Sequence, residues 1–427
     1  MSEPNPSLSA SPGTVACSIG DGENEPWILV LGTADWNQPI ATNQHYVSRA
    51  LSEIEGARVT FVESLALRRP ELTTRDIRRV LDRLRSAFRR KKVSPANEAW
   101  RPRPPRLDVV SPLIMPIHSG AFAKLNRRLL GYTLRAWLRY DGPTLLWAYT
   151  PTTYDLESAA KGTVYHCVDL LGEVPGIDGA LIDREERRLA SKNTLSAAAS
   201  KVVQAHLTDI GFSDVQLWEN VADTATIAAA HPETSTRIPL RVIFAGNLSP
   251  AKVDYELLER LARAGLDVRV AGPRAEGGGR DHQLFSSLID SGVSYLGMLS
   301  LDELAAEMVT ASVGLIPYRL NEYTRGVSPL KTFEYLAAGL AVVATALPGV
   351  SPLAPDIYVT RDSDEFVAET VRLAAAPTND EIDRRLVVAQ SNSWDARSVQ
   401  VRAYAHAALG AGSKDDHGNQ GRTRESR

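Results

Sequence analysis

The feature that most constrains the fold is a short helix pattern that runs directly into an apolar strand pattern. Ser328 is suited to cap that helix, and Pro329 is suited to its first position, where no N–H group is needed. Gly339 is suited to end it in the left-handed conformation, and the β-branched run Ala341–Thr345 is typical of a strand inside a parallel sheet. The N-terminus of the helix therefore points into a crevice, where its N–H groups and dipole can bind a phosphate.

Two side chains near this N-terminus suit a nucleotide-sugar: Lys331 adds positive charge, and Glu334 can accept two hydrogen bonds from a ribose diol. The stretch containing them resembles the donor-binding segment of glycosyltransferases of GT-B architecture, especially the family-four-type (group 1) bacterial enzymes that build polysaccharides. The resemblance implies that Glu334 binds the ribose and that Ser328, Pro329, Leu330 and Lys331 belong to the donor site. The alternative for Glu334 is a carboxylate on the helix surface.

One position departs from the family pattern. Many members have a second glutamate eight residues before the first, in contact with the donor sugar, and that position is Gly326 here. Recognition of the sugar is therefore expected to differ, with Asn321, Tyr323 or Thr324 of the preceding loop as candidates.

A second donor-binding segment is expected after the first strand of the C-terminal half. The family often has Gly-Arg-Leu-x-x-x-Lys-Gly there, and this chain keeps Lys252 but has Asn247 in place of the arginine. The resemblance implies that Lys252, with Asn247 beside it, faces the donor diphosphate, whose negative charge grows as the glycosidic bond breaks. Lys331 or Arg325 is expected to replace the missing charge. The alternative for Lys252 is an exposed loop lysine.

Catalytic candidates lie at the end of an apolar strand in the N-terminal half, the edge at which ligands bind in open α/β sheets. His166 and Asp169 are near that end, and either could orient or deprotonate an acceptor hydroxyl. Family resemblance favours Asp169. The alternatives are a core histidine with satisfied hydrogen bonds and an aspartate that caps the next element.

The loop after the first strand is expected to line the acceptor side. Gly32 allows a close approach of the backbone to a ligand, and we assign it to the donor side. Asn43, Gln44 and His45 open the next helix, where relatives often carry a polar triplet.

Alternation of short apolar strands with helix patterns, in two sets, predicts an α/β protein with two doubly wound Rossmann-like domains that face a cleft. Residues 201–205 are among the strands expected in the first set. The predicted regions are a disordered tail (1–25), an N-terminal Rossmann-like acceptor domain (26–222), a linker (223–239), a C-terminal Rossmann-like nucleotide-sugar domain (240–392), a crossover helix returning to the N-terminal domain (393–411) and a second disordered tail (412–427).

Composition excludes several other classes. Two cysteines in 427 residues do not suggest a disulfide framework and suit a cytoplasmic protein. No apolar run approaches the length of a membrane span, and no secretory signal is recognisable. Asp362 and Asp364 precede a helix pattern, which favours capping over metal binding. We therefore expect no metal and no cofactor, because the nucleotide-sugar is the substrate.

Positive charge is concentrated in one region. Residues 68–140 contain 19 Lys and Arg against 5 Asp and Glu, whereas the whole chain has a net charge of −3. Within this region an amphipathic helix pattern begins at Arg75 and ends at Val93. This helix is expected to rest on an anionic membrane surface, and a solvated helix is the alternative. Nucleic acid is not expected as a partner, because no recognition motif accompanies the charge.

Together these features predict a cytoplasmic glycosyltransferase of hexosyltransferase type, peripheral at the inner face of the membrane. It would move a sugar from a nucleotide-sugar to a cell-surface polysaccharide, a glycolipid or another acceptor hydroxyl, with retention of configuration as the family resemblance implies. The alternatives are a sugar-nucleotide epimerase of the same fold and a catalytically degenerate nucleotide-sugar-binding protein. The sequence does not identify the sugar, the base, the acceptor or the oligomeric state.

Overall fold

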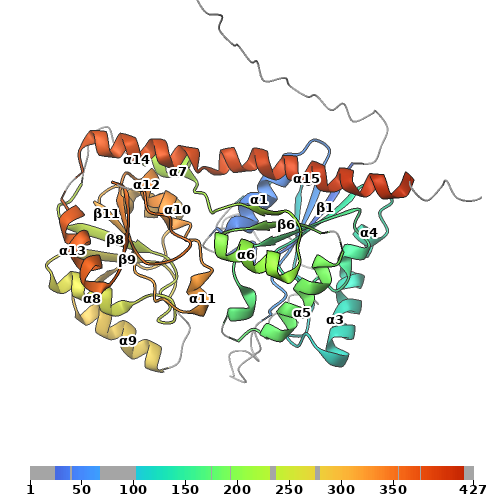
Figure 1. The fold of residues 1–427 in the computed structure, drawn as a ribbon, viewed down its shortest axis with the longest axis horizontal. Coiled ribbons are helices and arrows are strands. Elements are labelled where there is room, and N and C mark those ends of the chain that lie inside the picture. Colours follow the sequence, from blue (N-terminus) through green and yellow to red (C-terminus); the bar gives the residue numbers. More distant parts are fainter. Residues whose placement is uncertain are drawn as a thin grey trace, which may run out of the picture.

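The computed structural model describes residues 25–38, 41–67, 102–174, 176–192, 194–230, 237–274, 279–353, 355–375 and 377–417. Two parallel sheets, each covered by helices on both faces, dominate the fold (Figure 1). The first sheet has seven strands in the order β3-β2-β1-β4-β5-β6-β7, and the second has six in the order β10-β9-β8-β11-β12-β13. Both orders reverse direction beside the first strand of the sheet, as in doubly wound Rossmann folds. The predicted fold class is therefore confirmed.

The N-terminal domain contains strands whose side chains are buried by helices on both faces. Its strands are β1 (Trp27–Leu31), β2 (Arg58–Val62), β3 (Leu107–Val110), β4 (Thr144–Ala148), β5 (Gly162–Cys167), β6 (Leu195–Ala198) and β7 (Val215–Leu217). Its helices are α1 (Asn43–Ser52), α3 (Gly120–Thr133), α4 (Arg135–Leu138), η2 (Leu156–Ser158), η3 (Leu171–Glu173), α5 (Gly179–Ala190) and α6 (Lys201–Ile210).

Strand β1 shows how this sheet separates two cores. All five of its residues are buried, and successive side chains point to opposite faces. Ile28 and Val30 pack in the core that contains Val47 of α1, whereas Leu29 packs with Leu130 of α3. A strand covered on both faces has to be apolar at every position, which is why this segment was recognisable in the sequence.

The C-terminal domain repeats this plan around a single large core. Its strands are β8 (Arg241–Ala245), β9 (Asp267–Ala271), β10 (Ser294–Tyr295), β11 (Val313–Ile316), β12 (Ala341–Thr345) and β13 (Ile357–Thr360). Its helices are α7 (Thr224–Ala228), α8 (Tyr255–Arg263), α9 (Gly279–Asp290), α10 (Leu301–Met308), α11 (Glu322–Arg325), α12 (Lys331–Ala337), α13 (Ser363–Leu373) and α14 (Asn379–Ser391). Helix α7 lies within the predicted linker, and its Ile227 is part of this core.

One predicted strand is wrong. Residues 201–205 begin α6, because Ser200 caps the helix by accepting a hydrogen bond from Val203 N at 3.2 Å. Gly211 ends the helix in the left-handed conformation, with φ of 114°. The strand of this region is instead β6, which lies immediately before the helix.

The last helix, α15 (Trp394–His417), follows α14 and lies along the N-terminal domain in Figure 1, so the chain returns there from the C-terminal domain. Trp394 stacks on Tyr46 of α1 with 4.6 Å between ring centroids, and Tyr404 OH donates to Ser196 O at 3.0 Å. Residues 412–417, assigned to a disordered tail from the sequence, belong to α15, whereas residues 1–24 and 418–427 lie outside the described residues.

Candidate active site between the two domains

The candidate site lies where the carboxyl ends of the two sheets meet, the edge at which open α/β sheets bind ligands. From the N-terminal domain, Asp169 follows β5 and Asn220 follows β7. From the C-terminal domain, Lys252 follows β8, and Gly326 and Ser328 precede α12. Hydrogen bonds that cross between the domains hold these segments together.

Gly326 is buried against the N-terminal domain. A Cβ atom added to it would lie 2.8 Å from Leu170 Cγ, closer than real Cβ contacts. Ser200 Oγ also crosses the interface and donates to Gly326 O at 3.1 Å. In this arrangement of the domains, Leu170 therefore fills the space that a side chain at position 326 would need.

A chain of two asparagines connects α1 to the segment before α12. Asn43 Nδ2 donates to Asn220 Oδ1 at 2.6 Å, and Asn220 Nδ2 donates to Ser328 O. Both asparagines are buried, so these bonds are shielded from competing water. The sequence placed Asn43 on the acceptor side, but it did not indicate Asn220 or this connection to the donor segment.

Asp169 and Lys252 influence each other across the interface. Burial raises the pKa of Asp169 to about 6, while the positive charge of Lys252 acts in the opposite direction. Burial alone would lower the pKa of Lys252, but Tyr318, Tyr323 and Asp169 raise it overall above its usual value. A carboxyl that can accept a proton near neutral pH is thus influenced electrostatically by a lysine that stays charged at that pH.

Lys252 is held by its own domain. Its Nζ lies 4.6 Å from the ring centroid of Tyr318, a cation–π contact, and its carbonyl accepts a hydrogen bond from Arg319 N at 2.8 Å. The side chain is half-buried rather than the exposed loop lysine of the alternative interpretation. Asn247, in contrast, is exposed.

Helix α12 begins later than predicted. Its N-cap is Leu330, and the helix runs Lys331–Ala337, so Ser328 is not the cap and Pro329 is not the first helical residue. Pro329 O nevertheless accepts a hydrogen bond from Thr332 N at 3.3 Å, which continues the turn toward the helix. Lys331 and Glu334 form an ion pair, and Glu334 is buried, contrary to a plain helix-surface carboxylate.

The inner side of α12 is fixed to the sheet. Tyr335 is fully buried, accepts from Ala245 N at 2.8 Å and donates to Leu315 O at 3.3 Å. Gly314 allows this approach, because a Cβ there would lie 2.2 Å from the tyrosine ring. Gly339 ends the helix with φ of 74°, as predicted. The helix therefore presents Lys331 and Glu334 from a rigid base.

Several polar groups in the loop expected to recognise the sugar already bond to other residues of the C-terminal domain. Thr324 is fully buried, and its hydroxyl donates to Arg319 O at short range. Asn321 accepts from Thr324 N at 2.9 Å and donates to Ala251 O at 2.9 Å. Arg325 forms an ion pair with Glu322. Tyr323 differs from these residues in contributing to the raised pKa of Lys252.

His166 has the surroundings of a core residue. Its ring lies 4.9 Å from that of Tyr149 and 5.5 Å from that of Trp218, and it is 2% exposed. Burial, followed by the charge of Arg397, lowers its pKa to about 3. Neither ring nitrogen has a hydrogen-bond partner among the described residues. His166 is therefore buried like a core residue but lacks the hydrogen bonds of the satisfied core histidine in the alternative interpretation. Asp169, whose pKa is raised toward neutrality, is the better candidate base.

The polar triplet of α1 organises the first loop. Gln44 Oε1 accepts from Thr33 N at 2.8 Å, and His45 Nδ1 accepts from Thr42 N at 3.0 Å. A Cβ on Gly32 would lie 2.9 Å from Gln44 Oε1, so the close approach that Gly32 allows is to this glutamine. Gln44 and His45 thus hold the backbone of the loop, rather than offering these atoms to a ligand.

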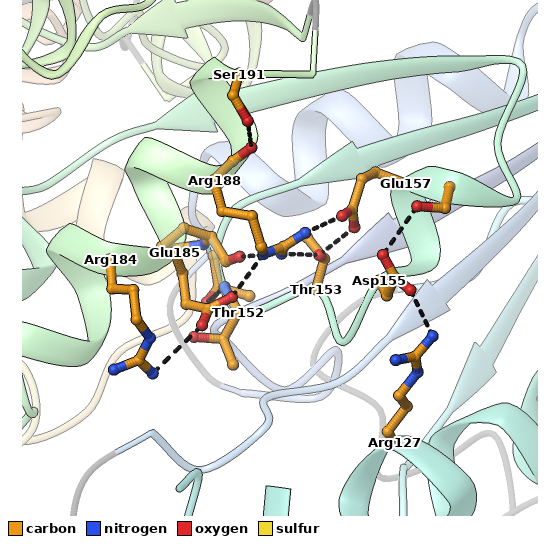
Figure 2. A network of polar contacts seen from close by, with 12 residues as sticks. Arg127, Thr152, Thr153, Asp155, Glu157, Arg184, Glu185, Arg188 and Ser191 are labelled. Atoms are coloured by element: carbon orange, nitrogen blue, oxygen red, sulfur yellow. Dashed lines mark hydrogen bonds and ion pairs between the residues drawn. The ribbon is translucent and has the colours of Figure 1, made fainter. Parts of the chain in front are cut away.

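The loop after β4 was missed in the sequence. Tyr154 and Asp155 both have positive φ, 54° and 72°, a strained conformation for residues other than glycine. Figure 2 shows how Arg188 of α5 holds the loop: it pairs with Glu157 and donates to Thr153 Oγ1 at 2.9 Å. Aspartate tolerates this conformation, but a tyrosine gives no sign of it in the sequence, which is why the strain at Tyr154 was not recognisable.

Side chains from the segment that precedes β4 in the chain also fix this loop. Asn126 of α3 donates to Tyr154 OH at 3.1 Å, and His118 Nδ1 bonds to the same hydroxyl. Burial raises the pKa of Tyr154 to about 12. Arg127, also on α3, pairs with Asp155 (Figure 2). Helix α3 is therefore joined by side-chain contacts to the loop that follows β4.

No metal site is evident in the described part of the chain, where no three His, Cys, Asp or Glu side chains gather around a possible ion. Asp362 caps α13 by accepting from Glu365 N at 2.9 Å, which confirms the capping interpretation. No helix within the described ranges combines the length and apolar character of a membrane span.

Comparison with known proteins identifies the C-terminal domain. Residues 232–376 match the family described as glycosyl transferases group 1. The chain is 28% identical over 168 residues to the putative teichuronic acid biosynthesis glycosyltransferase TuaH of Bacillus subtilis (strain 168). The match covers 38% of this chain and 42% of that protein, so it spans less than half the length of this relative.

Solved structures extend the likeness to the whole fold. The lipopolysaccharide outer core galactosyltransferase WaaB matches with a TM-score of 0.56 at 12% identity, covering 89% of this chain and 98% of that chain. WaaG, a glycosyltransferase involved in lipopolysaccharide biosynthesis, matches with a TM-score of 0.54 at 12% identity, covering 92% and 100%. At such low identity the likeness concerns the fold alone, which is GT-B.

Proposed function

We propose that this protein, whose residues 232–376 belong to the group 1 glycosyl transferases, transfers a sugar from a nucleotide-sugar to an acceptor hydroxyl in the synthesis of a cell-surface polysaccharide or glycolipid. The observation that carries the proposal is the electrostatic influence of Asp169 and Lys252 on each other across the two domains. A proton acceptor on one side and a fixed cation on the other are what glycosyl transfer from a diphosphate requires.

The donor would lie on the C-terminal domain. Glu334 would accept hydrogen bonds from the ribose hydroxyls, and Lys331, now paired with it, would move toward the diphosphate. Lys252 would stabilise the negative charge that develops on the leaving nucleoside diphosphate. The buried Tyr335 keeps this helix in place during the reaction.

The acceptor would lie on the N-terminal domain. Its hydroxyl oxygen would form the new bond on the face of the anomeric carbon from which the diphosphate oxygen departs, because retention in a single displacement requires attack on that face. Asp169 would orient the hydroxyl and receive its proton, for which a pKa near 6 suits neutral pH. Retention of configuration follows from the family resemblance and remains part of the proposal.

The class of acceptor is proposed from the curated relative, whose name places it in teichuronic acid biosynthesis. A polysaccharide or lipid-linked glycan of the cell envelope is therefore the acceptor that we propose, with the enzyme in the cytoplasm at the inner face of the membrane. The basic helix predicted between Arg75 and Val93 lies outside the described residues and stays a prediction. No cofactor or metal enters the proposed reaction.

The test begins with a thermal-shift screen of nucleotide-sugars, because a ligand that binds only the folded state raises the melting temperature. The selected donor is then incubated alone and with envelope glycan acceptors. Acceptor-dependent release of nucleoside diphosphate with a glycosylated product is the expected result. Formation of an epimer from the donor alone would show an epimerase, and binding without any turnover would show a degenerate binding protein.

A further inference from the structure

Helix α3 carries a second apolar face that points away from the core. Its inner face is made by buried residues such as Asn126 and Leu130. On the outer side, Tyr132 is 71% exposed and Phe122 and Leu125 are each 42% exposed. We define the apolar stripe of α3 as Phe122, Leu125, Leu129 and Tyr132, whose spacings of three and four residues place them on one side of the helix.

Basic side chains border this stripe. Lys124 and Arg128 are exposed and fall beside it on α3. Arg135, the exposed first residue of α4, lies with its guanidinium 4.7 Å from the ring centroid of Tyr132. Residues 120–140 contain five Lys and Arg and no Asp or Glu. The nearest acidic partner, Asp155, is taken by Arg127. The outer surface of α3 is therefore both apolar and positively charged.

We infer that the outer face of α3 is a docking surface for an anionic lipid bilayer. A single convex helix with an apolar stripe and a cationic border suits the boundary between headgroups and acyl chains, where both kinds of side chain gain. In Figure 1, α3 and α4 lie at the end of the N-terminal domain far from the C-terminal domain, where a flat membrane can approach them. This inference rests on the membrane location in the proposed function and deepens it; vesicle binding requires no turnover, so its failure and a failure of glycosyl transfer are distinguishable.

Docking through α3 would also orient the cleft. Asn126 of α3 bonds to Tyr154, and Arg127 pairs with Asp155, so the loop at the cleft end of β4 moves with the helix (Figure 2). A bilayer bound at the apolar stripe would thus have a fixed position relative to the part of the candidate site that we assign to the acceptor. A lipid-linked glycan would reach that side without leaving the membrane.

The experiment is sedimentation of the full chain with vesicles of phosphatidylcholine alone or with about one-third phosphatidylglycerol. Leu125→Gln combined with Tyr132→Gln removes the exposed apolar contacts without touching the inner face. Val387→Gln combined with Val399→Gln is the matched control, since these valines are 63% and 60% exposed elsewhere. We expect the α3 pair to lower binding to anionic vesicles by at least about tenfold and the control pair to bind as the parent does.

Charge is tested separately. The triple variant Lys124→Glu, Arg128→Glu and Arg135→Glu should abolish binding to anionic vesicles, whereas Lys161→Glu, Lys192→Glu and Lys201→Glu, which change the net charge equally, should not. Melting temperatures near that of the parent establish that each variant is folded. The inference is overturned if the parent stays in the supernatant with anionic vesicles at low salt, or if both α3 variants bind as well as the parent.

Discussion

Gly326 and Leu170 occupy the same space from opposite domains: a Cβ atom on the glycine would lie 2.8 Å from Leu170 Cγ. The φ of Gly326 is −85°, so its backbone does not require glycine. The close contact with Leu170 of the N-terminal domain is what requires glycine at this position. The residue that departs from the family pattern is thus explained by how closely the domains approach each other in this chain.

Gly326→Ala should disturb this closed arrangement, because a well-packed contact that receives an extra methyl group loses about 1–3 kcal/mol. We expect roughly a 5- to 100-fold fall in kcat/KM for glycosyl transfer, with a larger radius of gyration in small-angle scattering. Leu170→Ala in the same chain should restore most of the activity. A single Gly326→Ala variant as active and as compact as the parent would contradict the prediction.

Asp169 should determine the acid limb of the pH–rate profile. Its raised pKa means that the carboxyl is protonated below about pH 6 and charged above it, so kcat/KM should fall as the pH drops through 6. Asp169→Asn should lower the rate about 10²- to 10⁴-fold and remove this limb. Lys252→Met removes the charge that opposes the effect of burial, so in that variant the limb should move to higher pH. An Asp169→Asn variant with the parental profile would exclude the residue as the base.

Glu334→Gln should weaken donor binding, since it replaces a charged acceptor by a neutral one of the same size. The expected loss is about 1.5–3 kcal/mol, measured by titration calorimetry with the donor selected in the thermal-shift screen. Glu365→Gln is a suitable control, because Glu365 also lies in the first turn of a helix and pairs with a cation, Arg361. Equal donor affinity in both variants would remove Glu334 from the ribose site.

His206 should make stability depend on pH. Its hydrogen bond to the buried Glu186, at 2.8 Å, raises the pKa of the imidazole above its usual 6.5. A raised pKa means that the folded state binds the proton more tightly, so the stabilisation is fully present below pH 6.5 and is lost as the pH rises through the folded pKa. The difference in melting temperature between the parent and His206→Gln should therefore shrink from pH 5.5 to pH 8.5. A constant difference would contradict this.

The sequence predicted the fold best where the local residue pattern alone determines the structure. Buried strands such as β1 and β12 are apolar along their whole length, and Gly339 ends α12 as its position predicts. Strand β6 was missed because its residues, Leu-Ser-Ala-Ala, lack the β-branched side chains that mark strands. The strand is held by tertiary contacts instead, for example by the hydrogen bond from Tyr404 of α15 to the main-chain carbonyl of Ser196.

In the candidate site, too, the sequence indicated single residues but not the contacts between the domains. Lys252, Asp169 and Glu334 were recognisable from motif and position, although each motif gave only the residue and not its partner. The bonds from Asn220 to Ser328 and from Ser200 to Gly326 depend on how two domains meet, which no local pattern encodes. His166 was ambiguous in the sequence, because a histidine near a strand end suits a core as well as a site.

Helix α15 has a consequence for the order in which the chain folds during synthesis. Val401, Ala405 and Ala408 of this helix are buried in the core of the N-terminal domain, and Gly162 leaves room for Ala408 O, which would lie 2.3 Å from a Cβ there. The ribosome makes these residues after those of the C-terminal domain. The domain that is made first therefore cannot complete its core until α15 has followed the second domain, whereas the second domain can be finished before then.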